Sequence, residues 1–320
     1  MNETVSVVIA ARKGECFIAE ELRSLFLQSR PPDEILLADD DPAGTTAAEA
    51  EKLRGELPPG TRFRTSVNPR RLGVNGNMRQ LALRASGDFI FFCDQDDVWL
   101  PGKIARAVAA FREHPEIMLV HSLSEEFSAD GTARIDRRLF RAVRRTPREG
   151  LFAAYLSERI VASGHDMAIR REFLKSVPEF FPPWLYDGLL AKTAAALNAA
   201  LPIDEVLCRH RLHAANAANG ELLDNSSIRG RLSRLRVSGR DEIKEQLRGV
   251  RRFEKSVAEL PLPPRNREFL ERYVRYLKRR VALRRRNGAA RCFPGCGLIT
   301  DYFTMGNGVR SWLRDALFDR

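Results

Sequence analysis

The sequence predicts an α/β protein built on a mostly parallel sheet flanked by helices. Short apolar runs rich in β-branched residues alternate with segments whose apolar residues recur at helical spacing. The runs are apolar throughout, which is typical of strands covered by helices on both faces. Two of these runs end abruptly in clusters of aspartate. The chain therefore combines a buried sheet with acidic groups at one end of its strands.

Strand and helix alternate regularly over the first 122 residues. We expect strands at residues 5–11, 34–38, 62–67, 88–93 and 117–122. We expect helices at residues 17–28, 46–57, 75–85 and 103–113. The pattern weakens after about residue 135, where we expect helices at 150–157 and 188–200 and strands at 167–169 and 203–210. Such alternation implies parallel strands joined by covering helices.

The net charge of +11 is concentrated near the C-terminus. Residues 225–320 hold 24 Lys and Arg against 10 Asp and Glu, whereas residues 1–224 hold 29 against 32. A basic segment of this kind usually meets a polyanion. Its interleaved apolar and basic residues, as in Arg275–Arg286, favour a helix lying on anionic lipid. A solvated helix packed on the rest of the protein is the alternative. We expect no nucleic-acid binding, because no recognition motif accompanies the charge.

Cysteine content and hydropathy bear on the compartment. The five cysteines are an odd number, which favours reduced thiols over a disulfide framework. No apolar stretch approaches the roughly 20 residues that span a bilayer, and we see no leader pattern. We therefore expect a cytoplasmic protein that is peripheral on the cytoplasmic face of the membrane.

The strongest chemical signal is Asp94-Gln95-Asp96-Asp97, directly after an expected strand. Ligand crevices in such sheets lie beyond the carboxyl ends of the strands. Two carboxylates one residue apart suit a hard divalent cation that also binds substrate phosphates. Such a cation neutralises charge on a departing diphosphate. The alternative is a solvated turn before the next helix.

The stretch Phe-Phe-Cys-Asp-Gln-Asp-Asp-Val-Trp-Leu-Pro-Gly-Lys at residues 91–103 resembles the metal-site signature of family 2 glycosyltransferases. It is most similar to the rhamnosyltransferase-like members, and the resemblance extends from Val5 to about Asn216. It implies the nucleotide-diphospho-sugar transferase fold called GT-A, inversion at the anomeric carbon, and Mg²⁺ or Mn²⁺ as cofactor.

The same resemblance implies roles for individual residues. The expected nucleotide-binding residues lie at or just beyond the ends of the first four strands: Ala10, Arg12, Asp39, Asp40, Asn68, Gly73, Asn77, Asp94 and Gln95. The expected metal ligands are Asp94, Asp96 and His213. Asp187 matches the general base that takes the proton of the acceptor hydroxyl.

Each role has an ordinary structural alternative. Asp187 is also suited to capping a helix that begins at Gly188, His213 to a surface hydrogen bond, and Asn77 to a solvent-facing helix position. Two loops depart from the family pattern, at Ala11-Arg12-Lys13 and at residues 39–44. The identity of the nucleotide therefore stays open.

The sequence thus predicts a catalytic domain at residues 1–224 and a basic helical extension at 225–320. We expect an inverting transferase that moves a sugar, rhamnose being favoured, from a dTDP- or UDP-sugar to a glycan or lipid-linked acceptor. The expected setting is bacterial surface polysaccharide synthesis. The alternative is a catalytically silent relative that serves as a membrane-docked scaffold in an assembly complex.

Overall fold

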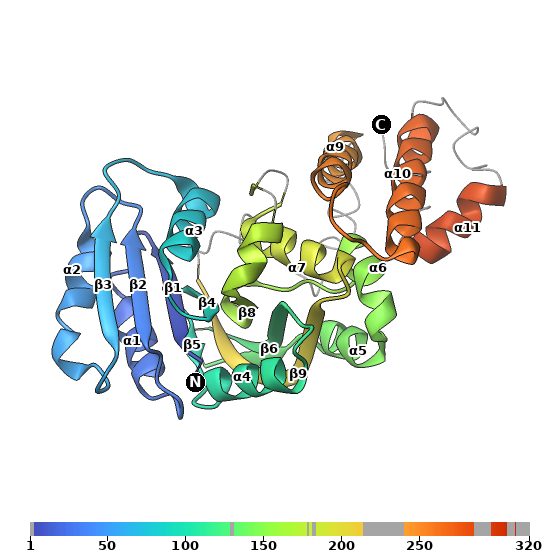
Figure 1. Cartoon of the computed structure of the whole chain (residues 1–320). Helices are drawn as coiled ribbons and strands as arrows, with labels where there is room; N and C mark the ends of the chain where they lie inside the picture. The colour runs from blue at the N-terminus through green and yellow to red at the C-terminus, as the bar shows by residue number, and fades with distance from the viewer. Residues whose placement is uncertain are drawn as a thin grey trace. The chain divides into compact units, whose positions relative to one another are not determined.

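The computed structural model describes residues 3–128, 131–177, 179–180, 184–213, 240–284, 296–305 and 311 (Figure 1). The chain divides into two compact units, residues 1–214 and 215–320. The predicted boundary at residues 224 and 225 lies outside the described residues.

The first unit contains one mixed sheet whose strand order is β3-β2-β1-β4-β8-β6-β9-β5, with β7 paired to β6. Its strands are β1 Val5–Ala11, β2 Glu34–Asp39, β3 Arg62–Val67, β4 Phe89–Asp94, β5 Val98–Trp99, β6 Leu119–Ser128, β7 Ala133–Ile135, β8 Met167–Arg170 and β9 Ala200–Leu212. The four strands from β3 to β4 are parallel. The other half is mixed, because β8 runs antiparallel to β4 and β6, whereas β9 runs parallel to β6.

Helices cover both faces of this sheet, as Figure 1 shows for its first half. They are α1 Ile18–Phe26, α2 Thr45–Glu51, α3 Gly73–Arg84, α4 Lys103–Glu113, α5 Arg137–Arg145, α6 Leu151–Leu156 and α7 Tyr186–Ala196. Short 3₁₀ segments are η1 Arg54–Glu56, η2 Arg148–Gly150, η3 Gly164–Asp166 and η4 Arg171–Ser176. Along β1, odd-numbered side chains such as Val7 pack with α1 and α4, and the other face meets α3. This two-sided burial explains why β1 and β2 are mostly apolar.

Most expected elements are present. The strands at residues 5–11 and 62–67 and the helix at 103–113 match β1, β3 and α4 to the residue. The expected helix at 46–57 is two pieces, α2 and η1. Helix α5 was not expected, because its arginines outnumber the apolar residues that pack on one side of it.

The described part of the second unit is helical: α9 Arg240–Ser256, α10 Pro264–Arg284 and α11 Cys296–Met305. Pro264 occupies the first position of α10, where proline costs no intrahelical hydrogen bond. Tyr273, Tyr276 and Leu277 of α10 are buried within this unit. The expectation that these apolar side chains face lipid is therefore wrong: α9 and α11 contact α10, and its basic residues are mostly exposed. A second basic stretch, residues 229–240, for which the sequence also favours a helix, lies largely outside the described residues.

Two further expectations concern cysteines and membranes. Cys16, Cys93 and Cys208, the cysteines whose state the structure describes, are free thiols. Within the described ranges, no helix has the length and hydropathy needed to cross a bilayer.

A close backbone approach at Gly87 gives a test of the packing of β1 against β4. A Cβ atom on Gly87 would lie 2.6 Å from the Ser6 backbone nitrogen and 2.8 Å from its Oγ. Because backbone cannot move aside, Gly87→Ala is expected to lower the free energy of unfolding by about 1–3 kcal/mol. Gly55→Ala is the control, since nothing lies within 4 Å of its added Cβ. Urea denaturation measures both, and equal stabilities for the two variants would contradict this packing.

Candidate functional site

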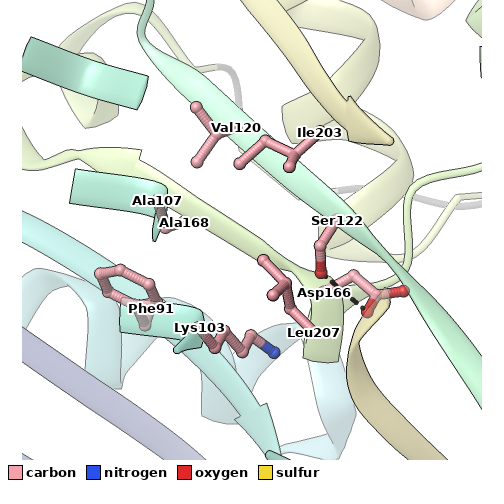
Figure 2. Close-up of a pocket in the computed structure, with 9 residues that line it drawn as sticks. All are labelled: Phe91, Lys103, Ala107, Val120, Ser122, Asp166, Ala168, Ile203 and Leu207. Carbon is pink, nitrogen blue, oxygen red and sulfur yellow. Dashed lines mark hydrogen bonds between the residues drawn. The ribbon is translucent and has the colours of Figure 1, made fainter. Parts of the chain in front are cut away.

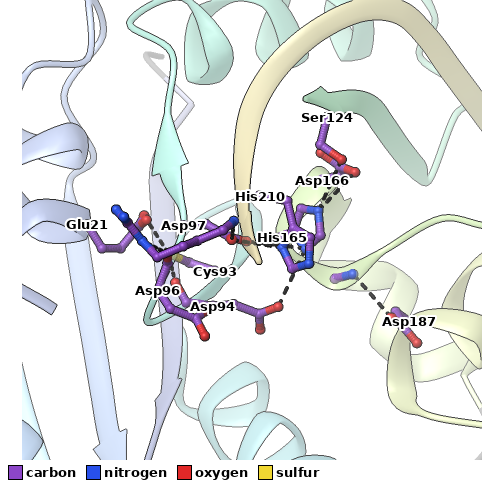
Figure 3. A network of polar contacts seen from close by, with 12 residues as sticks. Glu21, Cys93, Asp94, Asp96, Asp97, Ser124, His165, Asp166, Asp187 and His210 are labelled. Atoms are coloured by element: carbon purple, nitrogen blue, oxygen red, sulfur yellow. Dashed lines mark hydrogen bonds and ion pairs between the residues drawn. The ribbon is translucent and has the colours of Figure 1, made fainter. Parts of the chain in front are cut away.

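The acidic residues of the site lie at the carboxyl edge of the parallel strands (Figure 3). The registers pair Ala10 with Asp94 and Ala11 with Asp39, so the ends of β1, β2 and β4 lie side by side. Loops from these three strands therefore converge, as the sequence predicts. Sheet topology, rather than proximity in the chain, brings Asp39 and Asp94 to one edge.

The carboxylates after β4 become progressively more buried along the chain. The side chain of Asp94 is 40% exposed and that of Asp96 is 11% exposed, whereas Asp97 is fully buried. Burial raises the pKa of Asp96, and the negative charges of Asp97 and Asp94 raise it further. A hydrogen bond from His213 opposes this rise. The turn therefore concentrates negative charge where a cation would be stabilised.

The end of β9 folds over this acidic turn. His213 Nε2 lies 2.8 Å from Asp96 Oδ2, and the His213 ring stacks on Phe17 with ring centres 4.6 Å apart. The Arg211 backbone N–H donates to Asp97 Oδ1 at 3.0 Å, and its Nε donates to the Asp96 carbonyl at 3.0 Å. The structure thus places His213, a predicted metal ligand, directly against Asp96, a second one.

Gln95 connects the acidic turn to the loop after β1. Its Oε1 accepts a hydrogen bond from the Arg12 N–H at 2.7 Å, and its Nε2 donates to the Arg12 carbonyl at 2.9 Å. A Cβ on Gly14 would lie 2.1 Å from Gln95 Oε1, so a larger residue there would displace the Gln95 side chain. Gln95 therefore fixes the backbone of this loop and leaves the Arg12 side chain exposed at the site.

The predicted nucleotide-binding residues after β2 and β3 form a buried hydrogen-bonded group. Asp40 accepts from Asn68 Nδ2 at 2.9 Å and from the Leu72 and Gly73 N–H groups at 2.7 and 2.8 Å. Asn77 donates to the Ala38 carbonyl at 2.9 Å and is 1% exposed, so the alternative of a solvent-facing Asn77 is wrong.

Asp39, at the end of β2, is also buried. It accepts from the Asp41 and Ala47 N–H groups at 3.0 and 3.1 Å. These contacts make the loops after β2 and β3 rigid and shape the edge of the sheet from within.

Asp187 lies in the first turn of α7. Its Oδ1 accepts from the Gly188 N–H at 2.6 Å, and its Oδ2 accepts from the Gly164 N–H at 3.2 Å. The helix begins at Tyr186 rather than at Gly188, and its N-cap is Leu185. Burial raises the pKa of Asp187, and the negative charge of Asp94 adds to this effect. Gly164, which binds Asp187, directly precedes His165, whose Nδ1 lies 3.5 Å from Asp94 Oδ2.

Asn75 attaches the start of α7 to α3. Its Oδ1 accepts from the Tyr186 N–H at 2.8 Å, and its Nδ2 donates to the Trp184 carbonyl at 3.3 Å. Trp184 is 8% exposed, and the Lys192 ammonium lies 4.6 Å from the centre of its ring. Asn75 thus holds the start of α7 beside α3.

Sequence reasoning missed a group formed by Asp97, His165 and His210. One ligand atom from each lies within 4.8 Å of the others. Burial disfavours a charged His165, but Asp166 and Asp97 outweigh it and raise the pKa of His165 well above its usual value. Two of the five histidines of the chain, His165 and His210, thus lie beside Asp97, the third acid of the turn. Asp97 belongs to the acidic motif that the sequence shows, whereas His165 belongs to no recognisable motif.

A small cavity lies behind the site, between Lys103 and Asp166 (Figure 2). It leaves about 10 Å³ for the centre of a water molecule, roughly what one buried water needs. The Lys103 ammonium donates to the His165 carbonyl and lies 3.8 Å from the centre of the Trp99 ring. This cavity is too small for a nucleotide or a sugar.

Solved structures share this fold. The region 1–349 of Staphylococcus aureus TarS, solved with UDP-GlcNAc, superimposes with a TM-score of 0.59, covering 86% of this chain and 72% of that one at 17% identity. The mannosyltransferase PcManGT of Pyrobaculum calidifontis, solved with GDP-Man and Mn²⁺, gives 0.57 over 99% and 86% at 17% identity. These likenesses confirm the predicted GT-A fold.

The curated relatives match only part of this chain and only part of their own length. An uncharacterized glycosyltransferase of Nostoc is 25% identical over 66% of this chain and 66% of its own length. The dTDP-rhamnosyl transferase RfbG of Shigella flexneri is 31% identical over 31% of this chain and 35% of its own length. The matched part of this chain thus spans at most two thirds of these relatives.

The family model described as glycosyl transferase family 2 matches residues 6–177, which include the strands β1 to β4 and the acidic turn after β4. More than half of the chain follows this model, and the fold agrees with it. We conclude that the chain belongs to glycosyl transferase family 2.

Proposed function

We propose that this protein transfers a sugar from a nucleoside diphosphate sugar to an acceptor hydroxyl, with inversion at the anomeric carbon. The observation that carries the proposal is the acidic pair Asp94 and Asp96 at the carboxyl edge of the sheet, with Asp187 in the first turn of α7 as a third carboxylate of the site. Asp94 and Asp96 form a partly exposed acidic pair, and the charge of Asp94 raises the pKa of Asp187. Family membership supports the same reaction class.

The acidic pair suits a divalent cation. Asp94 and Asp96 would bind Mg²⁺ or Mn²⁺ through their carboxylates, and His213 would bind it through its imidazole. The close approach of His213 Nε2 to Asp96 Oδ2 and the raised pKa of Asp96 both fit a site that gains a cation. When bound, the ion neutralises charge on the departing diphosphate. PcManGT, of the same fold, was solved with Mn²⁺ and its donor.

The chain's own residues would orient donor and acceptor. The loop after β1, fixed by Gln95, presents the exposed Arg12 side chain to the donor diphosphate. Ala10, Asp39, Asp40, Asn68, Gly73 and Asn77 shape the nucleotide-binding edge from beneath. Hydrogen bonds from Gly188 and Gly164 hold the carboxylate of Asp187 while it accepts the proton of the attacking hydroxyl. A raised pKa makes Asp187 a better proton acceptor than a solvated aspartate.

The favoured donor sugar is rhamnose on dTDP, which the similarity to RfbG supports. UDP is the second candidate nucleotide, since TarS was solved with UDP-GlcNAc. The proposed setting is bacterial surface polysaccharide synthesis with a glycan or lipid-linked acceptor. Membrane contact would be electrostatic, through exposed residues of α10 such as Arg275 and Lys278.

We propose residues 1–224 as the catalytic domain and residues 225–320 as its basic helical extension. All residues proposed here to bind the donor or the metal, or to accept the proton, lie within residues 1–224. A silent scaffold is less well supported, because Asp94, Asp96, Asp187 and His213 are all present at one edge of the sheet.

Nucleotide binding tests the donor site. A nucleoside diphosphate that binds only the folded protein at 100 times its Kd adds about 2.7 kcal/mol of stability. We therefore expect one of dTDP, UDP, GDP and CDP to raise the Tm when Mn²⁺ is present. Asp96→Asn should abolish the Tm rise, whereas Glu172→Gln, an exposed change away from the site, should keep it. A Tm rise that survives Asp96→Asn would place the nucleotide elsewhere.

The pH profile tests Asp187. Because its pKa is raised, the base is protonated at higher pH than a solvated aspartate near ~3.9. The kcat/KM should therefore fall on the acid side at an apparent pKa above that value. Asp187→Asn should lower kcat about 10²–10⁴-fold with unchanged nucleotide affinity.

The stability of the same variant separates chemistry from folding. A raised folded-state pKa means that the ionised Asp187 is less favourable in the folded protein than in the unfolded chain. At neutral pH, Asp187→Asn should therefore leave the Tm close to that of the wild type. Glu172→Gln, an exposed change away from the site, is the control for kcat. Near-wild-type transfer by Asp187→Asn would show that another group accepts the proton.

A further inference from the structure

A second polar cluster lies beside the donor-side carboxylates. It joins three segments that are far apart in the sequence: the turn after β4, the 3₁₀ segment η3 and the end of β9 (Figure 3). They contribute Asp97, His165 and His210, of which Asp97 and His165 are buried and His210 is partly buried. The proposed transfer reaction uses none of these three side chains.

The spacing of the ligand atoms fits a metal ion. His165 Nδ1 lies 3.3 Å from Asp97 Oδ2 and 3.5 Å from Asp94 Oδ2. In a tetrahedral zinc site with bonds of about 2.0–2.1 Å, ligand atoms are separated by about 3.3–3.4 Å. A nitrogen of His210 falls within the 4.8 Å span that contains all three ligand groups. The rings of His165 and His210 stack nearly parallel with their centres 4.5 Å apart, so one ring turns when both bind the same ion.

The hydrogen bonding of Asp97 is an independent indication. Its Oδ1 accepts from the Arg211 N–H at 3.0 Å and lies 2.8 Å from His210 Nδ1. Its Oδ2 has no hydrogen-bond partner among the described residues, although the side chain is fully buried. A buried carboxylate oxygen without a donor is costly. Because this oxygen lies toward His165, a cation between them would satisfy it.

The surroundings of His165 resemble those of a metal-bound histidine. Its second ring nitrogen, Nε2, lies 3.3 Å from Asp166 Oδ2. Metal-ligating histidines usually direct their other nitrogen to a carboxylate, which orients the ring and strengthens the ligand. Asp166 is itself buried and lies 3.4 Å from Ser122 Oγ. The cluster thus has an inner set of ligands and an outer carboxylate.

We propose that Asp97, His165 and His210 bind a zinc-class divalent cation at a site separate from that of the donor diphosphate. Two imidazoles with a carboxylate suit Zn²⁺ and similar transition metals better than Mg²⁺. The ion would join the acidic turn to η3 and β9. This role is structural and does not depend on the proposed transfer reaction.

Metal content tests the proposal without any activity assay. The full-length protein, carrying no polyhistidine tag, is incubated with excess ZnCl₂, desalted and analysed by elemental mass spectrometry. We expect about one zinc per chain in the wild type and in His114→Gln, which alters a histidine that is 44% exposed. His165→Gln and His210→Gln should each lose it. Asp96→Asn and His213→Gln, which alter the donor side, should retain it.

Two outcomes would overturn the proposal. Loss of zinc in Asp96→Asn and His213→Gln, with retention in His165→Gln, would place the ion at the donor site. Absence of zinc from the wild type, with a Tm unchanged by a chelator, would show that protonated histidines balance the carboxylates instead. The chelator measurement on the wild type keeps the test decisive even if the histidine variants fail to fold.

Discussion

The crowding of carboxylates in the turn after β4 is the constraint on which the rest of the site depends. Asp94, Asp96 and Asp97 lie within four residues, and two of them are mostly or fully buried. Buried like charges repel strongly unless cations or donors compensate them. The second half of the domain supplies that compensation through β9 and η3. The mixed half of the sheet is thus needed to complete a site begun by the parallel half.

Backbone anchoring is a second theme of the architecture. Gln95 binds both backbone groups of Arg12, Asp40 binds the N–H groups of Leu72 and Gly73, and Asn75 binds the backbone at Trp184 and Tyr186. Each of these side chains is polar and lies near the ligand edge, but its bonds go to the protein itself. They hold the loops at this edge in place by charge and hydrogen bonding.

The burial of acidic residues at the site lowers the stability of the folded protein. Burial raises the pKa values of Asp96 and Asp187, which means that their ionised forms are disfavoured in the folded protein. In the proposed function, the same burial prepares Asp96 for a cation and Asp187 for a proton. Such groups persist because the large apolar core of β1, β2 and β4 supports the edge that carries them.

The sequence by itself determined the parallel half of the fold and its acidic edge. Runs such as Val5–Ala11 are apolar because the strand is buried on both faces, and strand ends must meet at one edge. Only the tertiary structure revealed the cluster of Asp97, His165 and His210, since β9 and η3 reach the acidic turn through long-range pairing. It also decided that the apolar residues of α10 pack against helices, because a helical pattern records an apolar face but not the surface that covers it.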